Sequence, residues 1–569
     1  MKKIKIFAIG LAALAMCACS EDLLKLDNPN SLTTETAFST ESDINASLTG
    51  IYHSFLSSYY AMMNTLQFSG QSDEATSHSV AWVTQYVLQE YSDMNCRWNF
   101  TSYNQLYEQV ARCNQVITYA ENVTEWNTYD KNQILAQAKA IRAYDYYQLA
   151  MMYQIAPYVD YVAAAGDQPQ AGVFEETCQK IINDAKFAYE TLPASYKTSD
   201  GYKGPYADLY MVTKWFAACV LAKTYMNWGD YLKGGYKYAE ALPYYKAVVE
   251  QGGFSLLADY NDNFKHDTEN NAESIWEIQF AECASTFGNY WGITNNGANV
   301  STTSWRWKFL GAAPIGWTDQ SAEPWVVYAF KNEKTVAPVN GSNWDPRLPA
   351  SVLYADIFKD YPNHVQWGEW NAETGFSNPD WNVNWAYCNK YVDQYTSATA
   401  INNANSDGTN LRVFRLGAIL LEYAECLAQT GDLAGAVKVV DQVRARAGLC
   451  PLGERQNYKV EDVWTNSETN GTTDFNAEYG YAAFENNAAG NLADFMKVLD
   501  LEKLKETAYE LDRFTDIRRW GISRDNEFLA KVKKRSYKYN ANFTPVRAWI
   551  PLPTDDVKNN PNLEQLTGW

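Results

Sequence analysis

Apolar residues recur along much of this chain at the spacing of one face of an α-helix. Leu106, Val110, Cys113 and Ile117 fall at i, i+4, i+7 and i+11, and the run from Leu209 to Val220 follows the same rule. Such a stripe is stable when it is buried against a neighbour, so the pattern predicts packed helices. We expect helices near residues 41–60, 102–121, 131–154, 174–191, 207–227, 238–251, 411–429, 433–446 and 493–519. The chain is therefore predicted to be mainly α.

Two stretches of the chain share the pattern of a helical hairpin. Ala222 is followed seven residues later by Gly229, and Ala424 is followed seven residues later by Gly431. After each glycine turn, a second helix carries apolar residues on the face that would meet the first helix: Ala241, Tyr245 and Val248 in one copy, and Ala436, Val440 and Val443 in the other. This arrangement is typical of tetratricopeptide units, which bury their faces only by stacking. We expect a tetratricopeptide-like scaffold.

Helical periodicity fades in three long stretches, near residues 252–410, 452–490 and 535–569, where Gly, Asn, Pro, Ser and Trp are common. Long irregular segments on a compact scaffold usually carry function. We expect these insertions to contain few, short strands. The predicted organisation is one domain over residues 41–569, with a helical scaffold at about 41–251 and 411–521, a loop-rich ligand region at about 252–410 and a C-terminal segment at 522–569.

The N-terminus has the pattern of a lipoprotein signal over residues 1–18. Three lysines among the first five residues precede an apolar run from Ile6 to Met16, which is too short to span a bilayer. Cys19 follows the small residue Ala18 and precedes a polar stretch. We expect cleavage before Cys19 and lipid on its thiol, with Cys17 as the alternative acceptor.

After the lipidated cysteine, residues 19–40 are expected to form a linker to the membrane. Each buried CH₂ of a lipid contributes about 0.8 kcal/mol, so the several acyl chains of a bacterial lipoprotein give stable anchoring. Glu21 and Asp22 resemble the acidic signal that directs Bacteroidetes lipoproteins to the cell surface, although a solvated acidic linker has the same composition. The expected location is the outer membrane, with the protein facing the cell exterior.

Charge and histidine content exclude several classes of function. The chain has 47 Lys and Arg against 67 Asp and Glu, a net charge of −20, which disfavours a nucleic-acid ligand. Its four histidines include no HExxH pair. We expect no metal and no cofactor. The acidic loop from Asp259 to Asp267 has oxygen ligands suited to Ca²⁺, but a solvated polar loop is the plainer interpretation.

Cysteine spacing predicts no disulfide framework. The eight cysteines after the signal are Cys96, Cys113, Cys178, Cys219, Cys283, Cys388, Cys426 and Cys450. They form no CxxC pair, and several occupy apolar helical positions, which favours buried thiols. Disulfides stay open as an alternative in an exported protein, because spacing alone does not pair cysteines.

Short motifs are spread along the chain in a fixed order. In the first half they are Leu106-Tyr107 with Asn114, and Arg142-Ala143-Tyr144 with Pro157. In the second half they are Asp345-Pro346-Arg347, Arg415 with Ala424-Glu425, Arg444 with Gly448, Arg513 with Asp516 and Trp520-Gly521, and Pro551 and Pro553 with Asn560-Pro561. Together they resemble the SusD/RagB family of Bacteroidetes outer-membrane lipoproteins over almost the whole chain after the signal.

The resemblance implies a fold, a function and a partner. It implies a SusD-like helical fold and capture of oligosaccharide or polysaccharide at the cell surface. It also implies delivery of that glycan to a SusC-like TonB-dependent transporter in the outer membrane, without enzymatic activity. Some members of the family take peptides or host glycans instead, so a peptide- or glycopeptide-uptake lid is the alternative function.

A sugar ring offers a flat CH face and a rim of hydroxyls, which aromatic rings and amides respectively complement. Three irregular segments have this composition: Trp82–Asn99, Asn289–Phe309 and Trp367–Trp385. From the first two we predict the glycan-binding residues Trp82, Trp98, Tyr290, Trp291, Asn296, Trp305 and Trp307. If Trp305 to Trp307 were extended, both indoles would share one face and Arg306 would point the other way.

Other interpretations of the same residues stay open. Any single tryptophan of these segments has an alternative role as an anchor that packs its loop against the scaffold. A surface glycosidase would need two carboxylates at a set separation, which coincidence supplies among 67 acidic residues. No GxSxG, P-loop or Cys-His arrangement is present. A tetratricopeptide scaffold that binds only proteins is the last alternative.

Overall fold

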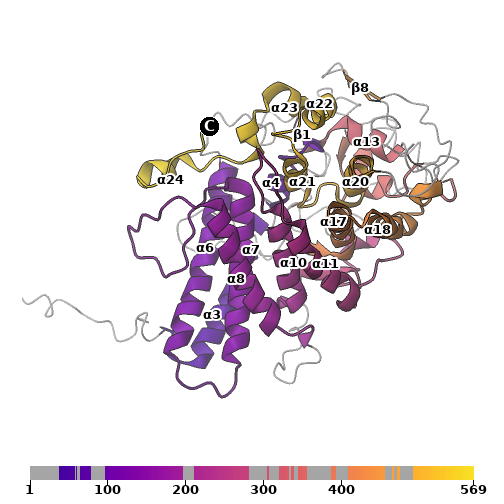
Figure 1. Ribbon diagram of the computed structural model, residues 1–569. Helices are drawn as coiled ribbons and strands as arrows, with labels where there is room; N and C mark the ends of the chain where they lie inside the picture. The colour runs from indigo at the N-terminus through magenta and orange to yellow at the C-terminus, as the bar shows by residue number, and fades with distance from the viewer. Residues whose placement is uncertain are drawn as a thin grey trace, which may run out of the picture.

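A row of stacked α-helices forms the scaffold of the protein in the computed structural model (Figure 1). The structure describes residues 37–57, 59–60, 64–77, 97–196, 210–280, 304, 306, 310, 320–331, 333, 335–338, 344–354, 386–391, 408–454, 464–466, 471–473 and 491–569. The row consists of α3 (Glu41–Ser54), α6 (Arg97–Tyr119), α7 (Lys131–Tyr153), α8 (Phe174–Thr191), α10 (Lys214–Asn227), α11 (Tyr238–Gln251), α17 (Leu416–Gln429) and α18 (Leu433–Arg446). Each helix packs on the next in chain order. The mainly α fold is confirmed.

Helix α7 is the centre of the N-terminal helices. It contacts α3, α6, α8 and α10, and every residue from Ile134 to Tyr153 except Lys139 is buried. Asp130 caps its first turn by accepting hydrogen bonds from the backbone N–H groups of Asn132 (2.8 Å) and Gln133 (3.2 Å). A helix surrounded in this way has no solvent face, so its polar side chains must find partners inside the protein.

The two predicted hairpins are present. α10 packs on α11, α17 packs on α18, and α11 packs on α17, so the pairs stack as tetratricopeptide units do. Ala222, Ala241, Ala424 and Ala436 are fully buried. Their small side chains allow the helix axes to approach closely, because interaxial distance depends on the residues at the contact.

Five predicted helices differ in extent from the observed ones. The helix expected over 41–60 ends at Ser54, and the one expected over 102–121 is Arg97–Tyr119. Residues 411–415 form strand β6 (Leu411–Arg415), and α17 begins only at Leu416. The helix expected from residue 207 begins at Lys214, after the N-cap Thr213. The helix expected over 493–519 is two helices, α20 (Leu492–Thr507) and α21 (Arg513–Trp520), because the chain turns at Tyr509, whose φ is 61°.

The strands are few and short, as expected. They are β1 (Ala75–Thr76), β2 (Ser274–Ile278), β3 (Ser321–Ala322), β4 (Val352–Tyr354), β5 (Ala386–Cys388), β6, β7 (Trp464–Asn466) and β8 (Gly471–Thr473). One four-stranded sheet has the order β1-β3-β5-β4, and β2-β6 and β7-β8 are two-stranded. All pairs are antiparallel.

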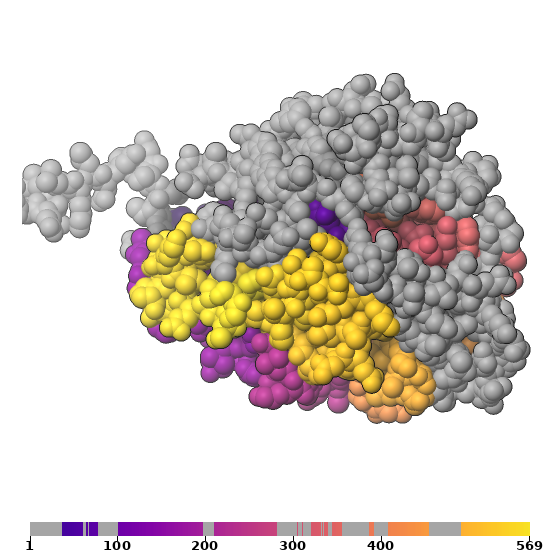
Figure 2. All heavy atoms as spheres, turned by 90° about the horizontal axis from the view of Figure 1, so that it is seen from above, coloured from indigo at the N-terminus to yellow at the C-terminus, as the bar shows by residue number. Residues whose placement is uncertain are grey.

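Short helices complete the described chain. They are α4 (Asn64–Phe68), α13 (Pro324–Lys331), α14 (Leu348–Ser351), α22 (Asn526–Arg535), α23 (Tyr537–Asn542) and α24 (Thr554–Asn559), with 3₁₀ turns at Ala120–Asn122, Tyr260–Asn263, Leu452–Glu454 and Pro545–Ala548. Figure 2 shows the C-terminal part of the chain, in yellow, lying across one face of the molecule beside the purple and magenta helices. The C-terminal segment therefore packs on the N-terminal scaffold.

One hydrophobic core runs through the molecule. A single cluster of buried side chains extends in sequence from Ile44 in α3 to Leu552 near the C-terminus. Trp276 of β2 links the halves, because its ring packs edge-on against Phe55 at 5.0 Å and against Phe216 at 4.9 Å between ring centroids. Six of the cysteines, Cys113, Cys178, Cys219, Cys388, Cys426 and Cys450, are free and buried. Four of them, Cys113, Cys178, Cys219 and Cys426, lie on helices, as expected for several of the cysteines.

Candidate glycan-binding site

The four-stranded sheet holds the ends of the three aromatic segments. Thr76 of β1 pairs with Ser321 of β3, and Ser321 pairs with Tyr387 of β5. The first segment follows β1, the second precedes β3, and the third connects β4 to β5, whose residues Tyr354 and Ala386 are paired. Strands far apart in sequence therefore bring these segments to one small platform.

The register of the sheet separates the third segment from the other two. Because β1 and β3 are antiparallel, the end of β1 at Thr76 lies beside the start of β3 at Ser321. The described chain thus leaves toward the first segment and returns from the second at the same end of these strands. Tyr354 and Ala386, from which the third segment departs and to which it returns, lie at the other end, one residue away. The first two segments supplied the predicted binding residues.

Most of the predicted binding residues lie outside the described part of the chain. These are Trp82, Tyr290, Trp291, Asn296, Trp305 and Trp307, so their contacts stay predictions. Trp98 lies in the first turn of α6, which begins at Arg97, and its side chain is outside the described set. Asn99, at the end of the first segment, is fully buried and donates a hydrogen bond to the backbone oxygen of Pro551 at 2.8 Å. Asn99 thus holds the C-terminal segment and is not available to a ligand.

Arg306 anchors the second segment. Its guanidinium is fully buried and donates to the backbone oxygens of Tyr60 (3.1 Å) and Thr409 (2.7 Å). It also lies over the rings of Phe280 and Tyr391, at 5.3 and 5.1 Å from their centroids. Arg306 is helical. The extended backbone considered for residues 305–307 is therefore wrong at Arg306, while Trp305 and Trp307 lie outside the described residues.

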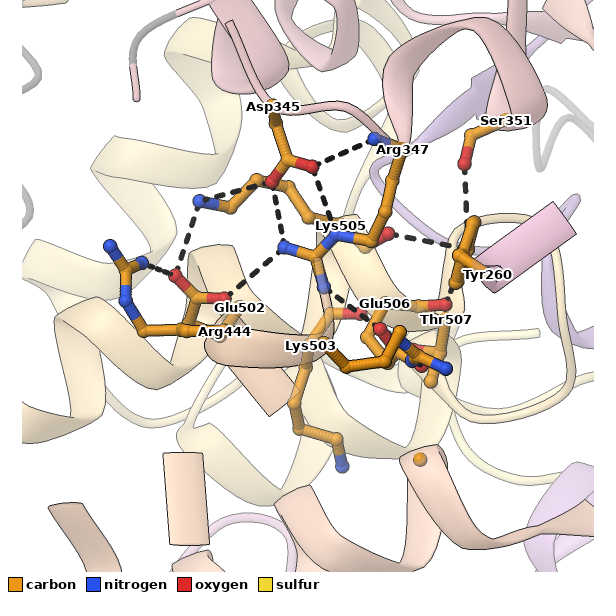
Figure 3. A network of polar contacts seen from close by, with 12 residues as sticks. Tyr260, Asp345, Arg347, Ser351, Arg444, Glu502, Lys503, Lys505, Glu506 and Thr507 are labelled. Carbon is orange, nitrogen blue, oxygen red and sulfur yellow. Dashed lines mark hydrogen bonds and ion pairs between the residues drawn. The ribbon is translucent and has the colours of Figure 1, made fainter. Parts of the chain in front are cut away.

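A buried network of ion pairs fastens the sheet to the helices (Figure 3). Arg347, five residues before β4, binds Asp345 at 2.7 Å and Glu506 of α20 at 2.8 Å. Lys390, just after β5, binds Glu510 at 2.7 Å. These contacts fix the chain before β4 and the chain after β5 on the same helical support.

The network is electrically balanced. Its carboxylates are Glu273, Glu333, Asp345, Glu502, Glu506 and Glu510, and its cations are Arg347, Lys390, Arg415, Arg444, Arg446 and Lys505. Six acids therefore face six bases, and all of them are buried except Arg446, which is partly buried. Burial alone would raise the pKa of Glu506, but Arg446, Arg415 and Arg347 outweigh it and hold that pKa well below its usual value. The cluster is a structural fastening without a free charge for catalysis.

A second group of ion pairs fastens β1. Asp73, two residues before β1, accepts from Arg513 Nε at 2.7 Å and lies 2.9 Å from Arg535 Nε. Burial opposes ionisation of Asp73, while Arg513 and Arg535 lower its pKa, and the balance is a lowered pKa. Arg513 also pairs with Asp500 of α20 at 2.7 Å. The chain that leads into the first aromatic segment is thus held by α20, the helix that also pairs with Arg347.

Carboxylic acids with raised pKa values are the residues to check for glycosidase chemistry. Burial, opposed by Arg513, raises the pKa of Glu74 to about 8, and burial raises that of Asp145 well above its usual value. Both side chains have no solvent exposure. A general acid must reach the glycosidic oxygen, and these two do not reach the surface.

Metal-binding and membrane-spanning features were sought in the described residues. These residues contain no group of three or more His, Cys, Asp or Glu placed to hold a metal ion. In the loop from Asp259 to Asp267, Asp259 caps the backbone N–H of Asn261 at 2.9 Å and Asp262 pairs with Lys265 at 2.9 Å. None of the described helices combines the length and apolar character needed to cross a bilayer.

Two family models match the chain. The model of the SusD family matches residues 272–569, and a second model, described as starch-binding associating with outer membrane, matches residues 22–226. The scaffold, the small sheet and these matches define a SusD-like protein. The chain belongs to the SusD family, as its motifs indicated.

Several known proteins are similar over almost their full length. A SusD-like protein of Formosa agariphila is 22% identical, over 99% of this chain and 98% of its own. Among solved structures, a SusD superfamily protein from Bacteroides vulgatus aligns with a TM-score of 0.68 at 19% identity, covering 94% of this chain and 100% of its own. Surface glycan-binding protein A from Bacteroides thetaiotaomicron, solved with laminarihexaose, aligns with a TM-score of 0.63 at 17% identity, covering 93% of this chain and 99% of its own. These likenesses establish the fold.

Proposed function

We propose that this protein is a glycan-binding lipoprotein of the cell surface. It captures oligosaccharide or polysaccharide and delivers it to a SusC-like TonB-dependent transporter, without cleaving it. Membership of the SusD family supports the carbohydrate ligand. The pairing of Thr76 with Ser321 also supports the proposal, because the described chain leaves toward the first aromatic segment and returns from the second at this pair. Acyl chains on Cys19 hold the protein at the outer membrane.

The binding platform is tested by removing its rings. Replacing Trp82, Trp98, Trp291, Trp305 and Trp307 together by Ala should lower affinity more than about a hundredfold, because each aromatic contact contributes about 0.5–1.5 kcal/mol beyond its buried area. The measurement is retardation in native gels containing laminarin, amylopectin, xylan or galactomannan, with circular dichroism to confirm folding. Trp228, on the helical row, lies under Lys237 at 3.1 Å, so Trp228→Ala serves as the matched control. Unchanged retardation of a folded five-Trp variant would refute the site.

The same preparations distinguish the alternative functions. A peptide-uptake lid would not be retarded in any of the polysaccharide gels and would bind members of a peptide library instead. A surface glycosidase would release reducing ends from the polysaccharide during incubation. For the anchor and the partner, Cys19→Ala should move the protein from the membrane to the soluble fraction, and the wild-type protein should co-purify with a TonB-dependent transporter from detergent-solubilised outer membranes. If the wild-type protein co-purifies with neither a transporter nor lipid, the delivery role is contradicted.

A further inference from the structure

The chain between α7 and α8 forms a closed loop on the surface of the helical row. Residues 154–173 contain neither helix nor strand, yet their ends meet, because Gly172 N–H donates to the backbone oxygen of Ile155 at 2.9 Å. A Cβ at position 172 would collide with the backbone oxygen of Ala156, so the closure requires glycine. Long loops with joined ends and no secondary structure of their own are usually functional.

Four side chains from elsewhere hold this loop in place. Tyr107 donates to the backbone oxygen of Pro157 at 2.6 Å, and Asn114 donates to those of Val159 (2.9 Å) and Tyr161 (3.0 Å). Arg142 in turn donates to the side-chain oxygen of Asn114 at 2.8 Å. In the second half of the loop, Asn560 donates to the backbone oxygen of Pro169 at 2.8 Å. The loop surface is therefore fixed in advance of any ligand, which lowers the entropy cost of binding.

The loop and the start of α8 enclose a groove of about 500 Å³ with apolar surface exposed in it. Tyr161 is 45% exposed and Val173 is 51% exposed. Both are among the few large hydrophobic side chains left open to solvent in the described chain, and both line this one groove. Tyr158 also lines it, but its ring is already stacked on Tyr146 at 4.1 Å and covered by Lys180 Nζ at 4.4 Å from its centroid. Tyr161 is thus the free aromatic face.

Polar side chains also line the groove, beside the exposed Tyr161 and Val173. Gln168 and Gln170 supply amides, and Asp160, Glu176 and Lys180 supply charged groups of both signs. Lys180 Nζ lies 3.6 Å from an oxygen of Asp160, with both side chains nearly half exposed. An aromatic face with amides and paired charges around it complements the CH face and hydroxyls of a sugar.

We propose that this groove is a second saccharide-binding subsite, in which Tyr161 stacks on one sugar ring and Gln170 and Asp160 bind its hydroxyls. The ligand class rests on the proposed glycan-binding function, whereas the groove itself does not. The volume lies within the range of about 300–1,000 Å³ that is usual for small ligands. The two carboxylates disfavour an anion, so the ligand is a neutral glycan.

A second subsite would change how the protein binds long chains. Residues of one polysaccharide that occupy the groove and the tryptophan platform together bind with avidity, because the second contact is intramolecular. A short oligosaccharide cannot span two sites. The groove therefore increases affinity for polysaccharide and leaves affinity for a short oligosaccharide at the tryptophan platform unchanged.

The test combines the two sites in one set of gels. The five-Trp variant should keep a weak retardation in at least one of the laminarin, amylopectin, xylan or galactomannan gels that retard the wild-type protein. Adding Tyr161→Ala to the five-Trp variant should abolish this weak retardation. Tyr161→Ala alone should weaken polysaccharide binding about threefold to tenfold, while calorimetric titration with laminarihexaose or the matching hexasaccharide stays unchanged.

Matched variants separate stacking from other effects. Tyr161→Phe keeps the flat ring and should bind as the wild-type protein does, and Tyr537→Ala removes a comparably exposed tyrosine (41%) far from the loop and should have no effect. If the five-Trp variant has no remaining retardation, or has one that Tyr161→Ala leaves intact, the groove is not a subsite although the glycan function stands. If no gel retards the wild-type protein, the glycan function itself fails, and the ligand class of the groove with it.

Discussion

Arginines of the motifs that carry the family resemblance are buried, and several bind more than one carboxylate. Arg347 of the Asp-Pro-Arg turn contacts Asp345 and also Glu506, which is 159 residues away in sequence. Arg519, beside Trp520, forms two hydrogen bonds to Glu425, at 2.8 and 2.7 Å. The sequence indicated the family from these residues but not their role, because partners so distant along the chain have no recognisable spacing. The structure thus assigns these arginines to fastening the scaffold.

Removing one partner of the buried network should be costly. Arg347→Met keeps most of the side-chain volume but removes the main partner of Asp345 and one of the three cations around Glu506. Six buried acids would then face five bases, so the free energy of unfolding should fall by about 3–5 kcal/mol. Denaturant unfolding measures it. The control is Arg112→Met, which breaks an exposed pair with Glu108 (3.0 Å) and should cost less than about 1 kcal/mol. Equal losses in the two variants would contradict a fastening role for the network.

Helix α20 is the element on which the fastening converges. Asp500, Glu502, Lys503, Lys505 and Glu506 are all buried on this one helix. Its charges reach Arg513 near β1, Arg347 before β4 and Asp516 of α21. Apolar periodicity predicted that a helix exists here, since Phe495, Val498 and Leu499 keep the helical spacing. It did not predict the break after Thr507 or the burial of charge, because both depend on tertiary partners.

The carboxylates of α20 should make the fold sensitive to acid. Burial opposes their ionisation, but nearby cations lower the pKa values of Asp500, Glu502 and Glu506 below those of an unfolded chain. Stabilisation from such groups is fully present above the unfolded values, near pH 4, and is lost as pH falls below them. The melting temperature should therefore drop steeply below about pH 4.5. Glu506→Gln should flatten this dependence, whereas Glu250→Gln on the exposed face of α11 should not; a parallel decline in both variants would contradict the assignment.

At the scale of the whole molecule, sequence reasoning recovered the scaffold better than the site. Helical spacing gave the order of the row, and the alanines at 222 and 424 gave the hairpins. The small sheet could not be predicted from the sequence, because strands as short as β1 and β3 have no periodic signal. Their register is set by contacts between residues far apart in the chain. The groove beside Tyr161 was also missed. Between α7 and α8 the sequence has 20 residues without helical periodicity, and Gly172 is among them. This long irregular stretch is the signal that could have indicated the groove.

The two regions matched by separate family models should unfold together. Ile550 N–H donates to the backbone oxygen of Met152 at 2.7 Å, and Arg518 donates to that of Met151 at 2.6 Å, so the C-terminal segment closes on the centre of the N-terminal helices. One hydrophobic cluster includes both. We expect a single calorimetric transition, and we expect a chain truncated after Asn542 to lose amide-exchange protection in α7 as well as near its new end. Two separate transitions, or an α7 that keeps full protection in the truncated chain, would mean that the halves are independent domains. The expected result follows from the position of α7, because a helix buried on every side loses protection when any of its neighbours is removed.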